Sequence, residues 1–203
     1  MKLAYVLKYP EEKNLVDDLY HFGYDGVEWA MLDPKEYHAH ETKISALGTG
    51  RNYTELGLSL SDPDENIRLK AISRVNEFIE LGAKINVPVI IGLIRGVVKG
   101  TLGETLERLR RSVEVINRTA LDNGITLLFE PLNRYESYLN TVEETVSFIK
   151  DYESCKILVD SYHFNIEERN FWEPIIQYRN YIAHVHVADN NRLWPGNAHI
   201  NFV

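Results

Sequence analysis

"HVHVAD", residues 184–189, places two histidines and an aspartate in a stretch that otherwise has the character of a buried β-strand. With a side-chain period of two, His184 and His186 share one face of this strand, and Val185 and Val187 take the opposite face. Titratable groups on a buried face need partners, because an unpaired polar group is costly there. The stretch therefore predicts that this end of the sheet carries a site as well as a core.

Short β-rich runs of the same kind recur along the chain, and segments with helical periodicity separate most of them. The seven predicted strands are LAYVL (3–7), DGVEWA (25–30), KISALG (43–48), VPVIIGLI (87–94), ITLLFE (125–130), CKILVD (155–160) and IAHVHVAD (182–189). One apolar stripe with helical spacing runs from Leu106 to Ala120 and ends at Gly124, the expected C-cap. Alternating strands and helices favour parallel pairing, in either a doubly wound open sheet or a βα barrel.

Two helix starts are also marked in the sequence. The segment "SDPDE" (61–65) offers Asp62 as an N-cap, and "NTVEE" (140–144) offers a capping box formed by Thr141 and Glu144. Both signals place helices directly after predicted loops, which agrees with the alternating pattern.

Composition limits the class of protein. The 203 residues, 44% of them hydrophobic, predict one domain spanning residues 1–203. A net charge of −8 argues against nucleic acid or an anionic membrane as partner. The single cysteine, Cys155, excludes a disulfide framework and fits a reducing compartment. Because there is neither a signal-peptide core nor an apolar run of membrane-spanning length, we expect a cytoplasmic protein.

Three successive predicted strands finish with polar residues: Glu130, Asp160 and His186. In a parallel sheet these residues would meet at the C-terminal edge, where barrel active sites are built. Taken singly, each carboxylate could be a helix cap and the histidine a core residue. Two carboxylates and an imidazole that converge would need a cation, and this donor set suits Mn²⁺, Mg²⁺, Co²⁺ or Zn²⁺. His184, one pleat deeper, is expected to be a core histidine with a hydrogen-bond partner.

Three motifs resemble signatures of a known superfamily. The segments "EPLNRYE" (130–136), "DSYHFNIEE" (160–168) and "HVHVADNNRLWPG" (184–196) resemble those of the sugar phosphate isomerase/epimerase superfamily, the xylose isomerase-like barrels, and within it the D-tagatose 3-epimerase-related proteins. The resemblance extends over nearly the whole chain. It implies a TIM-type (β/α) barrel with a small sugar as substrate.

The resemblance also implies roles for individual residues. Glu130, Asp160 and His186 match the ligands of one divalent metal ion, often manganese in that family. The positions that match substrate-contacting residues are Glu136, His163 and Arg192. The implied reaction is a metal-dependent sugar isomerisation or epimerisation through an enediolate, with Glu130 as the base. Epimerisation also needs a second base on the opposite face, which in the family is a Glu on the eighth strand.

The chain departs from the family pattern in three places. Only seven strands can be counted, so we expect the eighth strand and last helix to be absent, and the second crossover, "MLDPKEYHAHETK" (31–43), is too short for a full helix. The third difference is local, since "PGNAHINF" (195–202) has Asn197, Ala198 and Asn201 where relatives tend to have a second Gly and an Asp. Open strand edges invite pairing with another chain, so we expect homo-oligomers or aggregation and little 3-epimerase activity.

Two other functional classes follow as alternatives. One is a non-catalytic sugar- or metal-binding pseudoenzyme or truncated paralogue of the family, which turnover on ketohexoses would distinguish. The other is an endonuclease IV-like nuclease, which would need further metal ligands and a basic face that the sequence does not show.

Overall fold

A computed structural model of the chain describes residues 2–38 and 42–202, and the strands within it form a single seven-stranded sheet. Each strand pairs in parallel with the next along the chain. The strands are β1 (Ala4–Tyr9), β2 (Gly26–Met31), β3 (Ile44–Gly48), β4 (Val89–Ile91), β5 (Leu127–Phe129), β6 (Cys155–Asp160) and β7 (Ile182–His186). This is the expected barrel topology with seven strands. Among the described residues no pairing joins β1 to β7, so these two strands are the edges of the sheet.

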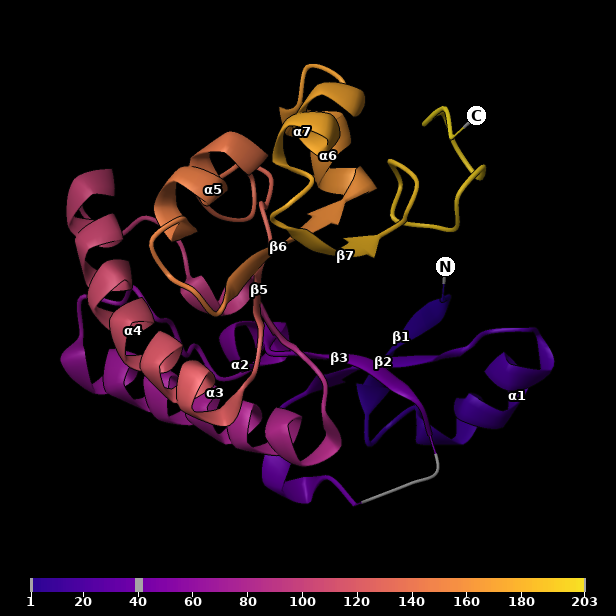
Figure 1. The fold of residues 1–203 in the computed structure, drawn as a ribbon, viewed down its shortest axis with the longest axis horizontal. Helices are drawn as coiled ribbons and strands as arrows, with labels where there is room; N and C mark the ends of the chain where they lie inside the picture. The colour runs from indigo at the N-terminus through magenta and orange to yellow at the C-terminus, as the bar shows by residue number, and fades with distance from the viewer. Residues whose placement is uncertain (1, 39–41, 203) are drawn as a thin grey trace.

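Helices follow most of the strands and cover the sheet (Figure 1). The α-helices are α1 (Val16–His21), α2 (Gly50–Thr54), α3 (Glu65–Ile85), α4 (Leu102–Asn123), α5 (Val142–Ile149), α6 (Ser161–Glu167) and α7 (Trp172–Tyr178). The 3₁₀ helices are η1 (Lys13–Leu15), η2 (Pro34–Glu36) and η3 (Leu93–Arg95). The two long helices, α3 and α4, pack against each other along one side of the molecule. Within the described ranges, every helix is too short or too polar to cross a bilayer.

The local signals for two helix ends are confirmed. Gly124 closes α4 in the left-handed conformation, with φ of 66°. Thr141 and Glu144 form the predicted capping box at the start of α5. The described part of the second crossover contains only η2, which agrees with the shortened crossover expected from the sequence.

The predicted N-cap at Asp62 is wrong. Helix α3 begins at Glu65, and Asp64 is its N-cap, since the Asp64 carboxylate accepts a hydrogen bond from the Asn66 N–H at 2.8 Å. Asp62 is buried, and it accepts the Asp64 N–H on Oδ1 at 3.0 Å and Lys99 Nζ on Oδ2 at 2.6 Å. Both aspartates satisfy the generic N-cap pattern, and the helix begins after the second of them.

The fourth strand is shorter than the predicted run of residues 87–94. It ends at Ile91, and the chain turns at Gly92 (φ −100°, ψ −113°) into the 3₁₀ helix η3. A β-carbon at Gly92 would lie 2.7 Å from Glu130 Oε2, which is far inside van der Waals contact. Glycine at this position therefore leaves room for the Glu130 carboxylate.

The core has two parts, one on each face of the sheet. The larger cluster lies between the sheet and its helices and includes the fully buried Trp29, Phe78 and Phe129. The smaller cluster, inside the curl of the sheet, consists of Ala46, Ile90, Leu128 and Leu158. On β3 to β6 the inner face is therefore apolar at mid-strand, and it becomes polar toward the C-terminal ends of β5 and β6.

The outer strands β1 and β7 are less covered. Val6 on β1 is 47% exposed and Val185 on β7 is 56% exposed, whereas the residues of β4 and β5 are buried. This agrees with the prediction that the first and seventh strands present open edges. Self-association through them stays a prediction.

Candidate active site

The period of the strands brings the three predicted ligands to one edge of the sheet. Asp160 is the last residue of β6 and is paired in register with His186, the last residue of β7. Glu130 directly follows β5, two residues beyond the inward-facing Leu128. All three side chains thus continue the inner face of the sheet at its C-terminal edge, as expected.

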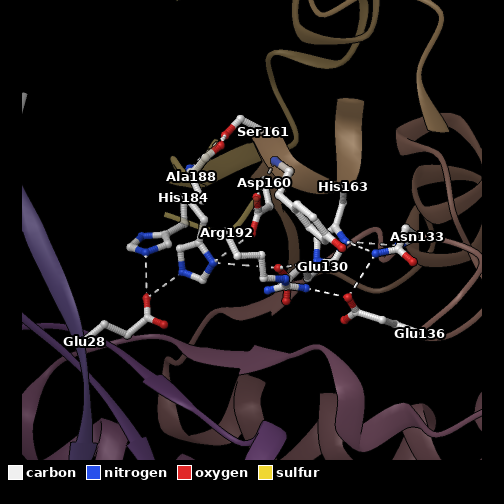
Figure 2. A network of polar contacts seen from close by, with 12 residues as sticks. Glu28, Glu130, Asn133, Glu136, Asp160, Ser161, His163, His184, Ala188 and Arg192 are labelled. Atoms are coloured by element: carbon white, nitrogen blue, oxygen red, sulfur yellow. Dashed lines mark hydrogen bonds and ion pairs between the residues drawn. The ribbon is translucent and has the colours of Figure 1, made fainter. Parts of the chain in front are cut away.

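The functional atoms of these residues face one another. His186 Nδ1 lies 3.7 Å from Glu130 Oε1 and 3.8 Å from Asp160 Oδ2. Figure 2 shows Glu130 and Asp160 directed into the same space. Adjacent ligands around an ion with bonds of about 2.1 Å lie about 3 Å apart. Small side-chain movements would therefore allow these three groups to share one divalent ion.

The charges at the site also suit a cation. Burial raises the pKa of Asp160, and the neighbouring Glu130 carboxylate raises it further. Burial opposes ionisation of His186, but Glu28 and Glu130 outweigh it and hold its pKa well above the ordinary value. A positive charge is thus favoured among the carboxylates, and the donor set of two carboxylates and an imidazole fits a divalent metal ion.

His163 lies beside Glu130 but has a different role from His186. It is 2% exposed, near the start of α6, and its Nδ1 accepts the backbone N–H of Asn133 at 3.2 Å. Burial lowers its pKa, so the ring is neutral and its proton is on Nε2, which lies 3.6 Å from Glu130 Oε1. His163 therefore presents a donor to the site, although its Nε2 lies close enough to Glu130 and Asp160 to complete a ligand cluster.

Glu136 and Arg192 are brought together as well. Arg192 Nη2 lies 2.5 Å from Glu136 Oε1, and its guanidinium stacks 4.1 Å from the centre of the Tyr162 ring. The Asn133 side-chain amide contacts both Glu136 Oε1, at 3.0 Å, and His163 Nδ1, at 2.9 Å. The three residues predicted to contact substrate thus form one network beside Glu130 (Figure 2).

The loop that carries Arg192 is organised by one buried carboxylate, which the sequence analysis did not identify. Asp189 accepts the backbone N–H groups of four loop residues, Asn190, Gly196, Ala198 and Ile200. These bonds outweigh desolvation and lower the pKa of Asp189 to about 2. The backbone N–H of Arg192 donates to the main-chain carbonyl of Asp189 at 2.9 Å, so both the backbone and the carboxylate of Asp189 hold the loop that carries the arginine.

Arg95 was also missed. It is fully buried, and its Nη1 donates to the backbone carbonyl of Glu130 at 2.6 Å while its Nε donates to that of Tyr138 at 3.1 Å. Within the described part of the chain its Nη2 has no hydrogen-bond partner. Burial lowers its pKa to about 10, so at neutral pH the Arg95 guanidinium is still charged while it holds the Glu130 carbonyl.

Glu28 is the third residue that the sequence analysis did not place in the site. Its Oε2 lies 3.0 Å from His184 Nε2 and 2.9 Å from His186 Nε2. Burial opposes its ionisation, but the two histidines lower its pKa to about 2. His184 thus has the hydrogen-bond partner expected of it. The available signal was a lone glutamate inside the apolar run DGVEWA.

Several known proteins resemble the chain in sequence and fold. The D-psicose 3-epimerase of Ruminiclostridium cellulolyticum is 29% identical, with 94% of this chain and 71% of that protein aligned. The ketose 3-epimerase of Arthrobacter globiformis is 27% identical, with 89% and 66% aligned.

The fold likeness extends over essentially the whole chain. The crystal structure of D-psicose 3-epimerase with D-tagatose, from Clostridium cellulolyticum H10, superposes with a TM-score of 0.81 at 25% identity, over 98% of this chain and 77% of that one. The apo 3-keto-D-glucoside 4-epimerase of E. coli gives 0.84 at 22% identity, over 100% and 84%. Residues 16–203 match the xylose isomerase-like TIM barrel family, and the chain therefore belongs to that family.

Proposed function

We propose that this protein is a divalent-metal-dependent sugar epimerase or isomerase that transfers a proton at the carbon next to the carbonyl of a small ketose. The observation that carries the proposal is the convergence of Glu130, Asp160 and His186 at the C-terminal edge of the sheet. The names of the two sequence relatives, a D-psicose 3-epimerase and a ketose 3-epimerase, support the same reaction class.

In this proposal Glu130, Asp160 and His186 hold the metal, with Mn²⁺ as the first candidate and Mg²⁺, Co²⁺ or Zn²⁺ as alternatives. When bound, such an ion polarises the substrate carbonyl and stabilises the negative charge that develops on its oxygen. The residues fit this role because two buried carboxylates and His186 Nδ1 already face one another.

Glu130 is the proposed base. Burial would raise its pKa, but His186, His163 and Arg95 outweigh that effect, and the pKa lies below the ordinary value. The carboxylate is therefore ionised at neutral pH and able to accept the proton from the sugar carbon. Its Oε2 lies against Gly92, where a larger residue would force it to move.

The neighbouring network would bind and orient the sugar. His163 Nε2–H can donate to a substrate oxygen, because its Nδ1 is already engaged by Asn133. Arg192 offers N–H donors and Glu136 offers an acceptor, and stacking on Tyr162 restricts the guanidinium to one plane. Polar groups of both kinds are what recognition of vicinal hydroxyls requires.

The test is exchange of the substrate proton with solvent. Protein stripped with EDTA and reloaded with Mn²⁺ is incubated with D-psicose or D-fructose in deuterium oxide, and NMR follows deuterium at C1 and C3 and the product formed. We expect metal-dependent exchange that Glu130→Gln abolishes, whereas Glu55→Gln, which changes an exposed carboxylate that pairs with Arg51 and is not part of the Glu130 network, behaves as wild type. Appearance of the C3 epimer would identify an epimerase, and appearance of an aldose an isomerase.

One result would contradict the proposal. If calorimetry shows that the wild-type protein binds Mn²⁺ and ketose but no deuterium enters the sugar, the chain is a sugar-binding protein without catalytic activity. The same titration with Asp160→Asn would then show whether metal binding needs this ligand set at all.

A further inference from the structure

Glu28 connects two parts of the sheet that are far apart in sequence. It projects from β2, is 4% exposed, and meets two histidines of β7 through a single oxygen atom. β2 and β7 are not neighbours in the sheet, so the contact spans the space enclosed by its curl. Figure 2 shows the Glu28 carboxylate directed at His184 from the opposite side of this space.

The contact with Glu28 determines which ring nitrogen of His186 is available to bind a metal ion. A carboxylate oxygen accepts hydrogen bonds, so the nitrogens at 2.9 Å and 3.0 Å are N–H donors, and His186 carries a proton on Nε2. Its other nitrogen, Nδ1, is the atom that faces Glu130 and Asp160 at 3.7 Å and 3.8 Å. The same contact also fixes the plane of the ring.

In an alternative arrangement, Nε2 of His186 would be the metal ligand and Nδ1 would carry the proton. Ligand atoms of Glu28, His184 and His186 lie within 4.8 Å of one another, so a cation could be held between them. That would require a lone pair on Nε2 of His186, and the proton would then reside on Nδ1. The neutral ring can serve only one of the two sites. The separations of 2.9 Å and 3.0 Å are hydrogen-bond lengths, which favours the first arrangement.

We propose that Glu28 is a positioning residue for the metal site: it holds the Nε2–H of His186 and so directs Nδ1, whose proton a bound metal ion would displace, toward Glu130 and Asp160. The inference rests on the proposed function, because it assumes that this site binds a metal ion. Metal-bound histidines are commonly oriented by a carboxylate on their second nitrogen, and loss of that partner typically weakens metal binding by about 10- to 100-fold.

The first test uses the wild-type protein and Zn²⁺ alone, since this ion is diamagnetic. Long-range ¹H–¹⁵N NMR of the histidine rings, with His186 assigned by comparison with His184→Gln, reports the state of each nitrogen. We expect Zn²⁺ to shift Nδ1 of His186 to a metal-bound value while the Nε2–H signal persists. Loss of the Nε2–H signal on Zn²⁺ binding would overturn the proposal and place the ion beside Glu28.

The second test measures Mn²⁺ affinity by calorimetry. We expect about 10- to 100-fold weaker binding in Glu28→Ala and a smaller loss in Glu28→Gln, which keeps an acceptor oxygen. Asp62→Ala is the matched control, because it removes another buried carboxylate whose partner, Lys99, lies outside the site. Thermal unfolding of each variant shows whether it is folded at the titration temperature.

The outcomes separate this inference from the function on which it rests. Wild-type protein that binds neither Mn²⁺ nor Zn²⁺ would overturn the proposed function and this inference together. Wild-type protein that binds Mn²⁺ no more tightly than Glu28→Ala would overturn the positioning role alone. Equal weakening in Asp62→Ala and Glu28→Ala would likewise show that the effect is general destabilisation.

Discussion

Replacing Asp160 with asparagine should stabilise the metal-free protein and abolish its response to metal. The Asp160 carboxylate is buried close to Glu130, and its raised pKa means that ionising it costs folding free energy at neutral pH. Asparagine has the same shape and can still accept the Tyr162 N–H that Asp160 accepts at 2.7 Å as the N-cap of α6. The variant therefore removes the charge while retaining the cap.

The magnitude follows from burial and from the separation of the charges. At an effective dielectric constant of about 20, the carboxylate oxygens of Glu130 and Asp160, which lie within 4.8 Å of each other, repel by about 3.5 kcal/mol or more. The imidazolium of His186, 3.8 Å from Asp160 Oδ2, attracts by about 4 kcal/mol on the same scale, so the two charge effects nearly cancel and the burial of Asp160 decides the sign. We expect Asp160→Asn to gain about 1 to 2 kcal/mol, which is about 2 to 8 °C in the Tm of a chain of this size.

The assay is thermal unfolding in EDTA and in excess Mn²⁺. A metal at about 100 times its Kd stabilises the wild-type protein by about 2.7 kcal/mol, and this shift should be lost in the variant. Asp64→Asn is the matched control, because it makes the same change at the N-cap of α3, away from the site. If Asp160→Asn melts lower than wild type in EDTA and keeps the Mn²⁺ shift, Asp160 is a structural cap and the ligand assignment fails.

Three further outcomes are expected. Arg192→Ala should raise the KM for ketose at least about tenfold and leave Mn²⁺ content unchanged, and Arg192→Lys should not restore binding, because lysine cannot stack on Tyr162 as a plane. Because burial raises the pKa of Cys155 to about 12, iodoacetamide at pH 8 should alkylate the folded protein about a thousandfold more slowly than the urea-unfolded chain. Urea titrations of metal-free protein should show that the free energy of unfolding falls from pH 4.5 toward pH 2. The fall should be smaller in Glu28→Gln, because Glu28 has a pKa of about 2 in the folded protein and is protonated at higher pH in the unfolded chain.

The metal-ligand candidates were predictable because only local regularities are needed to place them. A period of two puts Glu130, Asp160 and His186 on the inner face, and parallel pairing puts the ends of β5, β6 and β7 at one edge. Neither step requires knowledge of side-chain packing. The same reasoning failed at residues 92–94, because an apolar run gives no sign that Gly92 leaves the strand to accommodate a carboxylate.

Residues whose roles depend on distant partners were not predictable in this way. Arg95 reaches the Glu130 carbonyl only because η3 follows the short β4. Asp189 has the appearance of another polar strand end, and its four amide partners exist only once the loop through Ile200 has closed around it. In each case the partners of the buried charge lie on the other side of a turn in the chain. The periodicity of the sequence does not predict the geometry of such turns.

Glu28 shows what the curvature of the sheet adds to the site. The three candidate ligands come from the ends of β5, β6 and β7, which are directly paired, so their grouping depends only on local pairing. Glu28 comes from β2 and touches β7 only because the sheet curls. Opening the curl would leave the ligand strands paired but would free the His186 ring to rotate. The geometry of the site is therefore coupled to the curl of the sheet through the hydrogen bonds that Glu28 accepts from His184 and His186.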